Sequence, residues 1–421
     1  MNLDFKELLA EKLCPECGRV HRTDVKKVVM GKNVLPELPQ VIREMGDFHH
    51  VVMICDENTY VVAGKTVETL WAFDAVIVLD PHDLHANEHG VEMARKQLPA
   101  NTDLFVAVGS GTIHDITRYT AYHHGAPFIS VPTAASVDGY VSNVAAMTLQ
   151  GTKKTVVACA PLAMVADIDV IADAPMRLTA SGVGDMLGKY TALADWKIAH
   201  ALTGEYYCPH VVSLMEQALD SVIEGIDRLK VRDRDAIASL IYGLVLSGVA
   251  MQHTGISRPA SGAEHHISHF IEVTIPAERC SALHGEKVGV GLVLVSRLYH
   301  AFAALSDEEI SAGFVDWKKP DMEELTRIFG ALAPVLDAEN TPDCADKITK
   351  ERILANLPTI RKVIAAMPDE RQLTDILARC DACRTLTDIG LPEAMRDSLY
   401  NEAPLIRNRL TLMRLIRNLK V

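Results

Sequence analysis

The chain has 421 residues, of which 48% are hydrophobic and 23% charged, and its formal net charge is −13. This length exceeds one ordinary domain, and the composition is that of a soluble globular protein with a large core. The negative charge argues against a nucleic-acid partner, because a broad binding surface would have to neutralise a phosphate backbone. A small anionic substrate remains possible, since it needs only a local cationic pocket.

The same features argue against export or membrane insertion. No uninterrupted apolar run reaches the roughly 18–20 residues of a membrane span. The first residues include Asp4 and Glu7 and have no long apolar core, so we expect no signal peptide. Nine cysteines, an odd number scattered along a large chain, do not suggest a secreted disulfide framework. We therefore expect a cytoplasmic protein with no membrane partner.

Short apolar, β-branched runs alternate with helix-like stretches in the first part of the chain. The runs cover 51–55, 75–79, 104–108 and 128–131, and each ends at a polar, proline or glycine-bearing turn. This pattern predicts buried parallel strands with helical crossovers. Ligands of such sheets bind beyond the carboxyl ends of the strands. Residues 1–174 are therefore predicted to form an α/β dinucleotide-binding domain.

The pattern changes near Pro175. Segments 185–201, 213–229 and 235–253 carry apolar residues at helical spacing, and the remainder reads as helical up to Val421. Residues 175–421 are therefore predicted to form an all-α domain that binds metal and substrate.

A glycine loop follows the strand predicted at 104–108. Residues 109–115 read Gly-Ser-Gly-Thr-Ile-His-Asp, at a junction where the amides of a helix N-terminus can bind a diphosphate. Alone the loop is weak evidence, because glycines also close tight turns and the third glycine of the dinucleotide fingerprint is missing. The next strand ends in small and hydroxylated residues, 131–139, which let a flat ring lie close to the backbone. Two such neighbouring turns favour a dinucleotide.

Three separated clusters carry metal-ligand residue types. Asp185 follows two glycines, His265, His266 and His269 lie in one run, and His284 begins Leu-His-Gly-Glu further on. On a helix, His265 and His269 differ by about 40° in direction, while His266 points about 100° away from His265. One carboxylate with two imidazoles suits a divalent ion such as Zn or Ni, and three ligands leave coordination positions open for catalysis.

Other features of the sequence allow more than one reading. Lys189, four residues after Asp185, could pair with that carboxylate or reach an anionic substrate. Cys14, Cys17 and His21 look like part of a zinc site that lacks an obvious fourth ligand, and their role stays open. The second Cys-x-x-Cys, Cys380 and Cys383, lies in a helical stretch and is interpreted as structural.

Segments 132–139 (Pro-Thr-Ala-Ala-Ser-Val-Asp-Gly) and 257–266 (Ser-Arg-Pro-Ala-Ser-Gly-Ala-Glu-His-His) resemble the sn-glycerol-1-phosphate dehydrogenases in their longer bacterial form. These are members of the superfamily of iron-containing alcohol dehydrogenases and dehydroquinate synthases. The resemblance runs from about Val25 to Ala312 and extends weakly into the C-terminal helices. It implies a dehydroquinate synthase-like fold, an α/β domain followed by an all-α domain, and a homo-oligomer, expected to be a dimer.

The resemblance also implies roles for individual residues. The metal positions fall on Asp185, His265 and His284. Catalytic roles fall on His269 and Asp185, and substrate-binding roles fall on Asp138, Asp185 and His269. The implied nucleotide-binding residues are Asp56, Gly109, Ser110, Gly111, Thr112, Ile113, Thr133, Ala134, Ala135, Ser136 and Ser142.

The implied reaction is the reversible reduction of dihydroxyacetone phosphate by NAD(P)H to sn-glycerol 1-phosphate, for glycerophospholipid synthesis. The metal would polarise the ketone, the dinucleotide would supply the hydride, and His269 would bind a substrate hydroxyl or relay the proton. Candidates to bind the substrate phosphate are Arg258, Lys153, Lys154 and Lys189. Asp56 on the ribose would favour NAD, NADP stays possible, and the three ligands do not decide between Zn and Ni.

Three alternative functions are compatible with the same residues. A glycerol or polyol dehydrogenase would act on an unphosphorylated substrate. A lyase of the dehydroquinate synthase type would use NAD transiently and eliminate phosphate, although those enzymes resemble one another in having Glu where this chain has Asp185. A non-catalytic metal or nucleotide sensor fits poorly with an open coordination sphere.

Overall fold

The computed structural model of the chain describes residues 5–150, 152–276, 278–315 and 319–419. The chain divides into two compact units that do not follow chain order. The first comprises Met1–Gly182 and Ser213–Ile256, and the second comprises Val183–Val212 and Ser257–Val421. The predicted domain boundary at residues 174 and 175 stays a prediction.

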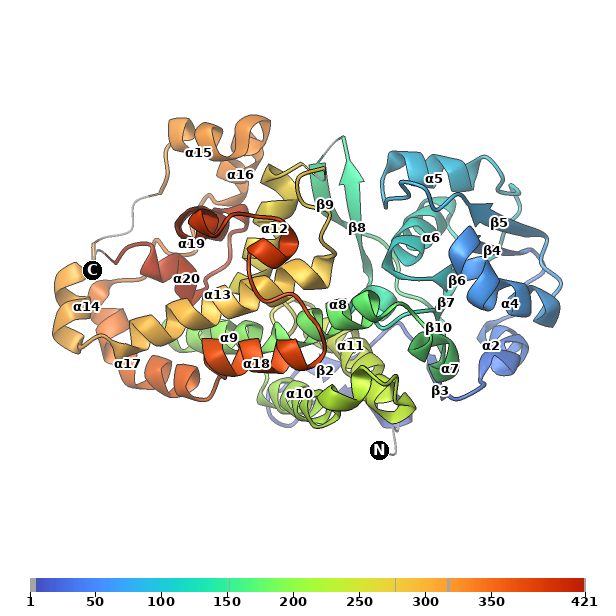
Figure 1. Cartoon of the computed structure of the whole chain (residues 1–421), viewed down its shortest axis with the longest axis horizontal. Coiled ribbons are helices and arrows are strands. Elements are labelled where there is room, and N and C mark those ends of the chain that lie inside the picture. The colour runs from blue at the N-terminus through green and yellow to red at the C-terminus, as the bar shows by residue number, and fades with distance from the viewer. Residues whose placement is uncertain (1–4, 151, 277, 316–318, 420–421) are drawn as a thin grey trace. The chain divides into compact units, whose positions relative to one another are not determined.

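The centre of the first unit is a six-stranded sheet (Figure 1). Across the sheet the strands are β3 (Lys27–Gly31), β10 (Ala163–Asp167), β7 (Phe128–Pro132), β6 (Leu104–Gly109), β4 (Val51–Asp56) and β5 (Ala75–Leu79). Every neighbouring pair is parallel. The α/β prediction for the N-terminal part of the chain is confirmed.

Helices cover both faces of this sheet. Alternate residues of β4, among them Met53, pack with α2 (Leu38–Met45) and α4 (Lys65–Leu70). The intervening residues, among them Ile54, pack with α5 (Glu88–Arg95) and α6 (Gly111–His124). A strand buried on both faces needs apolar residues at every position, which explains the continuous runs in the sequence.

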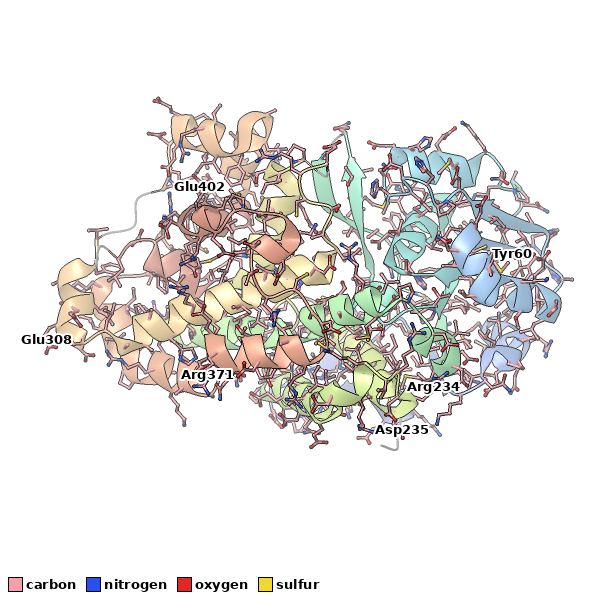
Figure 2. The ribbon with its side chains drawn as sticks, viewed as in Figure 1. Tyr60, Arg234, Asp235, Glu308, Arg371 and Glu402 are labelled. Atoms are coloured by element: carbon pink, nitrogen blue, oxygen red, sulfur yellow. The ribbon has the colours of Figure 1, made fainter. Side chains whose placement is uncertain are left out.

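Smaller elements complete the first unit. They are α1 (Phe5–Leu9), the hairpin β1 (Lys12–Leu13) and β2 (Val20–His21), η1 (Leu35–Glu37), α3 (Glu57–Thr59), η2 (Tyr60–Gly64), η3 (Gly139–Val141), the antiparallel pair β8 (Val144–Leu149) and β9 (Thr152–Val157), α7 (Ile168–Ala172) and α11 (Arg234–Thr254). Arg234, labelled in Figure 2, joins the start of α11 to the α7 region through Asp169 at 3.1 Å and Asp173 at 3.3 Å. Helices α8 (Met176–Leu187) and α10 (Pro209–Leu229) have residues in both units.

The second unit is helical over its described residues. Its helices are α9 (Lys189–Thr203), α12 (Ala263–Thr274), α13 (His284–Ala304), α14 (Asp307–Gly313), α15 (Met322–Phe329), α16 (Ala333–Glu339), α17 (Lys350–Ala365), α18 (Glu370–Arg379), α19 (Arg396–Glu402) and α20 (Leu412–Ile416), with short turns η4 (Gly330–Leu332), η5 (Thr387–Ile389), η6 (Glu393–Met395) and η7 (Ala403–Ile406). Ala199, Ile267, Val295 and Leu357 form part of one buried core. The prediction of a helical C-terminal region is confirmed.

Two described helices, α11 and α13, are long and apolar enough to span a membrane by length and composition alone. The apolar windows of these 21-residue helices have mean hydropathies of 1.4 and 1.2, and 72% and 67% of them is buried in the protein. Core helices of large domains have these same properties, so the two helices are weak evidence for a membrane span.

Candidate active site

Asp185, His265 and His284 come together in the second unit. Asp185 lies in α8, His265 lies near the start of α12, and His284 is the first residue of α13. One ligand atom from each residue lies within 4.8 Å of those of the other two. The Nε2 atom of His265 is 3.7 Å from Oδ1 of Asp185. The arrangement offers one carboxylate and two imidazoles to a single point.

Glycines allow the three helices to approach closely enough. A Cβ added to Gly184, beside Asp185, would collide with the carbonyl group of Gly285. A Cβ on Gly291 of α13 would likewise collide with the backbone of Glu264 in α12. Backbone contact of this kind needs residues without side chains. The glycines therefore set the spacing between the segments that carry the three polar side chains.

Glu264 orients His265. Its Oε1 lies 2.7 Å from Nδ1 of His265 and also accepts the backbone N–H of Gly262 at 2.6 Å. With Nδ1 directed at this carboxylate, His265 presents Nε2 toward Asp185. Burial, supported by the positive charge of Lys189, keeps the pKa of His265 well below its usual range. The imidazole is therefore neutral, the form that binds a metal, and its carboxylate partner is typical of metal-bound histidines.

Glu272 orients two other histidines in the same way. Its Oε1 is 3.1 Å from Nδ1 of His284, and its Oε2 is 3.2 Å from Nδ1 of His269. Lys287 also pairs with Oε1, at 3.1 Å. Burial opposes ionisation of Glu272, but His284, His269 and Lys287 together hold its pKa well below the usual range. Glu272 is therefore an anion that fixes the orientation of two neighbouring rings.

Lys189 pairs with Asp185 in the structure. Its Nζ lies 2.8 Å from Oδ1 of Asp185, and both side chains are fully buried. Burial opposes ionisation of Asp185, but the ammonium group of Lys189 brings the pKa of Asp185 well below its usual range. Of the two readings open from the sequence, the structure contains the ion pair.

The remaining two histidines of α12 differ in position. The His269 ring centroid is 5.9 Å from that of His265 and 5.8 Å from that of His284, so its ring borders the group. His266 is fully buried, and neither of its ring nitrogens has a hydrogen-bond partner among the described residues. His269 is thus a neighbour of the three candidate ligands, and His266 is not in their group.

The predicted nucleotide loops lie side by side in the first unit. Gly109 ends β6 and is paired in register with Pro132, which ends β7. The backbone N–H of Thr133 donates to the carbonyl of Gly109 at 3.0 Å. Ser110 precedes α6 but makes no side-chain cap, which leaves N–H groups of the first turn for a ligand. Thr112 and Ile113 lie in that turn, and the candidates Ala134, Ala135 and Ser136 follow β7.

The other candidates of the first unit have structural contacts of their own. Asp56 ends β4, and its Oδ1 accepts the N–H of Thr59 at 2.8 Å as the N-cap of α3. Asp138 accepts the hydroxyl of Ser247 at 2.8 Å. Ser142 accepts the N–H of Val144 at 3.1 Å through its hydroxyl oxygen. These bonds fix where the three side chains lie in the unit.

His114 is a supporting residue that the sequence did not single out. Its Nδ1 lies 3.0 Å from the carbonyl oxygen of Ser110, and its Nε2 lies 2.8 Å from the hydroxyl of Ser130 on β7. Because a carbonyl only accepts, Nδ1 carries the proton and Nε2 accepts from Ser130. Burial lowers the pKa of His114 to about 3. A neutral imidazole therefore joins the glycine loop to the adjacent strand.

This environment predicts a loss of stability in acid. The unfolded-state imidazole takes up a proton near pH 6.5 but the folded one only near pH 3, so the stability contributed by His114 is full above pH 6.5 and declines below it. Between about pH 7.5 and about pH 5 the loss is roughly 2 kcal/mol. Denaturant unfolding of wild type and His114→Gln should show a smaller pH slope in the variant, whereas the exposed His123→Gln should keep the wild-type slope. Equal slopes for wild type and His114→Gln would contradict this account.

The four basic residues predicted to bind phosphate have different surroundings. Arg258 pairs with Glu205 at 2.8 Å, Lys189 pairs with Asp185, Lys154 is exposed, and the side chain of Lys153 lies outside the described residues. A fifth residue, Arg407, carried no signal in the sequence. Burial lowers the pKa of His269 to about 4, and the positive charge of Arg407 contributes to this shift. Arg407 directly follows η7, which packs against α12, and its positive charge acts on His269.

The chain matches known proteins along most of its length. Residues 29–175 match the family model described as iron-containing alcohol dehydrogenase. A glycerol-1-phosphate dehydrogenase [NAD(P)+] of Bacillus licheniformis is 41% identical over 70% of this chain and 76% of the relative. The enzyme of that name from Halalkalibacterium halodurans is 33% identical over 94% of both chains.

Solved structures share the fold at lower identity. The iron-containing alcohol dehydrogenase of Corynebacterium glutamicum superposes with a TM-score of 0.62 at 17% identity, covering 94% of this chain and 95% of that one. The glycerol dehydrogenase of Schizosaccharomyces pombe gives a TM-score of 0.54 at 17% identity, covering 94% and 97%. From its sequence relatives, the chain belongs to the glycerol-1-phosphate dehydrogenase family, within the iron-containing alcohol dehydrogenases.

Proposed function

We propose that this protein catalyses the reversible, NAD(P)H-linked reduction of dihydroxyacetone phosphate to sn-glycerol 1-phosphate. The observation that carries the proposal is the convergence of Asp185, His265 and His284, with their ligand atoms within 4.8 Å of one another. Family membership supplies the substrate and the nucleotide, because the curated relatives are named for this activity. A dehydrogenase of this kind needs a site that activates a carbonyl and a site that binds a dinucleotide.

The donor set fits a divalent cation. Asp185 offers an ionised carboxylate, and Glu264 and Glu272 hold the Nδ1 sides of His265 and His284, so that their Nε2 atoms remain for coordination. Mixed nitrogen and oxygen ligands suit Zn or Ni, and three protein ligands leave room for substrate. When bound, the metal supplies Lewis-acid polarisation of the substrate carbonyl, and the nicotinamide supplies the hydride.

His269 is proposed to bind a substrate hydroxyl and to relay the proton. Its Nδ1 faces Glu272 at 3.2 Å, so Nδ1–H donates to that carboxylate and Nε2 is left as an acceptor. Burial keeps its pKa at about 4, so the ring is neutral at physiological pH. In the oxidation direction, Nε2 of the neutral imidazole would accept the alcohol proton while Nδ1–H passes a proton to Glu272. In the reduction direction the same two transfers would run in reverse and deliver the proton to the product oxygen.

In the first unit, the backbone of residues 109–113 is proposed to bind the diphosphate, with Thr133–Ser136 beside the ring and Asp56 on the ribose. The uncapped N-terminus of α6 supports this assignment, since its free N–H groups and dipole favour an anion. Asp138 and Ser142 are proposed for substrate and nucleotide contacts, respectively. A carboxylate at Asp56 disfavours the 2′-phosphate of NADP, so we propose that the protein uses both nucleotides and prefers NAD.

Reduced-nucleotide consumption tests the proposed reaction directly. After metal stripping and reconstitution with Zn or Ni, the absorbance of NADH and NADPH is followed with dihydroxyacetone phosphate and dihydroxyacetone, and the reverse reaction with glycerol and NAD. We expect net oxidation of the reduced nucleotide with the phosphorylated ketone. A preference for dihydroxyacetone or glycerol would indicate a polyol dehydrogenase, and phosphate release without net nucleotide oxidation would indicate a lyase.

Arg407 is proposed to bind the substrate phosphate, because a guanidinium near His269 is a bidentate donor suited to that group. Arg407→Ala should raise KM for dihydroxyacetone phosphate roughly tenfold to a hundredfold, the effect of losing a charged hydrogen bond. KM for unphosphorylated dihydroxyacetone should stay unchanged in the same variant, and the exposed Arg279→Ala should change neither value. Equal losses on both ketones would mean that Arg407 supports the site without touching phosphate.

Finer features of the family are proposed for this chain as well. They are a homodimer, a cytoplasmic location, and a role of the product in glycerophospholipid synthesis. The homodimer follows from the resemblance, and sedimentation of the purified protein tests it.

A further inference from the structure

The N-terminal hairpin places three ligand-type side chains together. Between β1 and β2, the N–H of Cys14 donates to the carbonyl of Arg19 at 2.9 Å, and the N–H of Gly18 donates to the carbonyl of Cys14 at 2.9 Å. Gly18 has φ +69°, the left-handed region that favours glycine. This tight turn holds Cys14 and Cys17 on one loop, and His21 follows on β2.

The spacing of the ligand atoms in this group is close to that of a tetrahedral metal site. The Sγ of Cys17 lies 3.3 Å from Nε2 of His21, and one ligand atom each from Cys14, Cys17 and His21 lie within 4.8 Å of one another. In a zinc site with Zn–S of about 2.3 Å and Zn–N of about 2.0 Å, neighbouring ligand atoms are about 3.5–3.8 Å apart. Little adjustment of the side chains would be needed to bind the ion.

The site is partly enclosed by protein. Cys14 and His21 are only 1% and 0% exposed. The His21 ring stacks on His253 of α11, with centroids 5.1 Å apart. Strands of two residues have too few contacts to be stable alone, so a cross-link would account for an ordered turn packed against α11.

We propose that Cys14, Cys17 and His21 supply three of the four ligands of a structural zinc ion, separate from the centre at Asp185, His265 and His284. Two thiolates and one imidazole form a softer donor set than the carboxylate and two imidazoles of that centre, and thiolate-rich tetrahedral sites select zinc. The zinc fixes the turn and with it the packing of His21 on α11, because metal binding contributes directly to the folding of small elements.

Cobalt substitution tests the proposal on the full-length protein. Stripped wild-type protein is titrated with Co²⁺, and a thiolate-to-cobalt charge-transfer band in the near ultraviolet is expected. The centre at Asp185 has no thiolate and cannot give this band. The double variant Cys14→Ser/Cys17→Ser should lose the band, and metal analysis of the purified variant should show the loss of one equivalent of zinc.

The second Cys-x-x-Cys provides a matched control. Cys380→Ser/Cys383→Ser should keep both the band and the zinc. Absence of the band in wild type, which requires no variant to fold, would overturn the proposal. So would a band that persists in Cys14→Ser/Cys17→Ser.

Discussion

His265→Ala is expected to lose both the bound metal and turnover. The imidazole is one of only three protein ligands proposed, and Glu264 holds it in the tautomer that presents Nε2 to Asp185. Lewis-acid activation of a carbonyl lowers the barrier by several kcal/mol, so kcat/KM should fall roughly 10³-fold or more. Metal content of the purified protein and nucleotide oxidation with dihydroxyacetone phosphate measure the two losses.

His266→Ala is the matched control for this variant. His266 is the next residue of α12 and is also buried, but it lies outside the group of three ligand atoms. The control should lose some stability through the cavity it creates, yet it should keep its metal and most of its activity. An active, metal-free His265→Ala protein would refute the assignment of the metal site.

Strands β4, β5, β6 and β7 could be predicted from the sequence because they are continuous apolar runs, whereas β3 and β10 carried no prediction. Cover by helices on both faces leaves no polar position in residues 51–55 of β4 or along β6, and continuous apolar runs are the result. The division into two units could not be predicted in the same way. Helix α11 is apolar around most of its circumference, so its periodicity does not tell which neighbours it packs against, and it belongs to the first unit.

The candidate ligands could be proposed because their residue types are rare in such groupings and the helical phase separates His266 from His265. The residues that support these ligands could not be proposed from the sequence. Glu272 looks like any helix carboxylate, and only tertiary contacts direct its two oxygens at His284 and His269. Arg407 is distant in sequence from every motif, and its proposed role depends on the packing of the preceding turn, η7, against α12. Partners of this kind are set by tertiary packing and leave no local pattern.

Lys189→Met is expected to destabilise the metal-free protein by roughly 3–5 kcal/mol, the usual effect of leaving one partner of a buried ion pair uncompensated. Lys189 and Asp185 are both fully buried and 2.8 Å apart. Lys27→Met is the matched control, because Lys27 and Glu44 are 2.6 Å apart but 32% and 39% exposed. An exposed pair contributes about 1 kcal/mol or less.

The pH dependence and the effect of metal make the Lys189 prediction specific. In wild type the pKa of Asp185 is lowered, so the stability gained from its ionised form is present above the unfolded pKa and declines as pH falls. Without Lys189, burial dominates and raises that pKa, so the variant should lose stability as pH rises from acid to neutral. A divalent cation would replace the missing positive charge and should restore much of the loss at neutral pH. Denaturant unfolding of the metal-stripped proteins measures both effects. Equal stability of the variant and the wild type would contradict a buried ion pair at this site. A loss of stability that added metal does not relieve would contradict the assignment of Asp185 as a ligand.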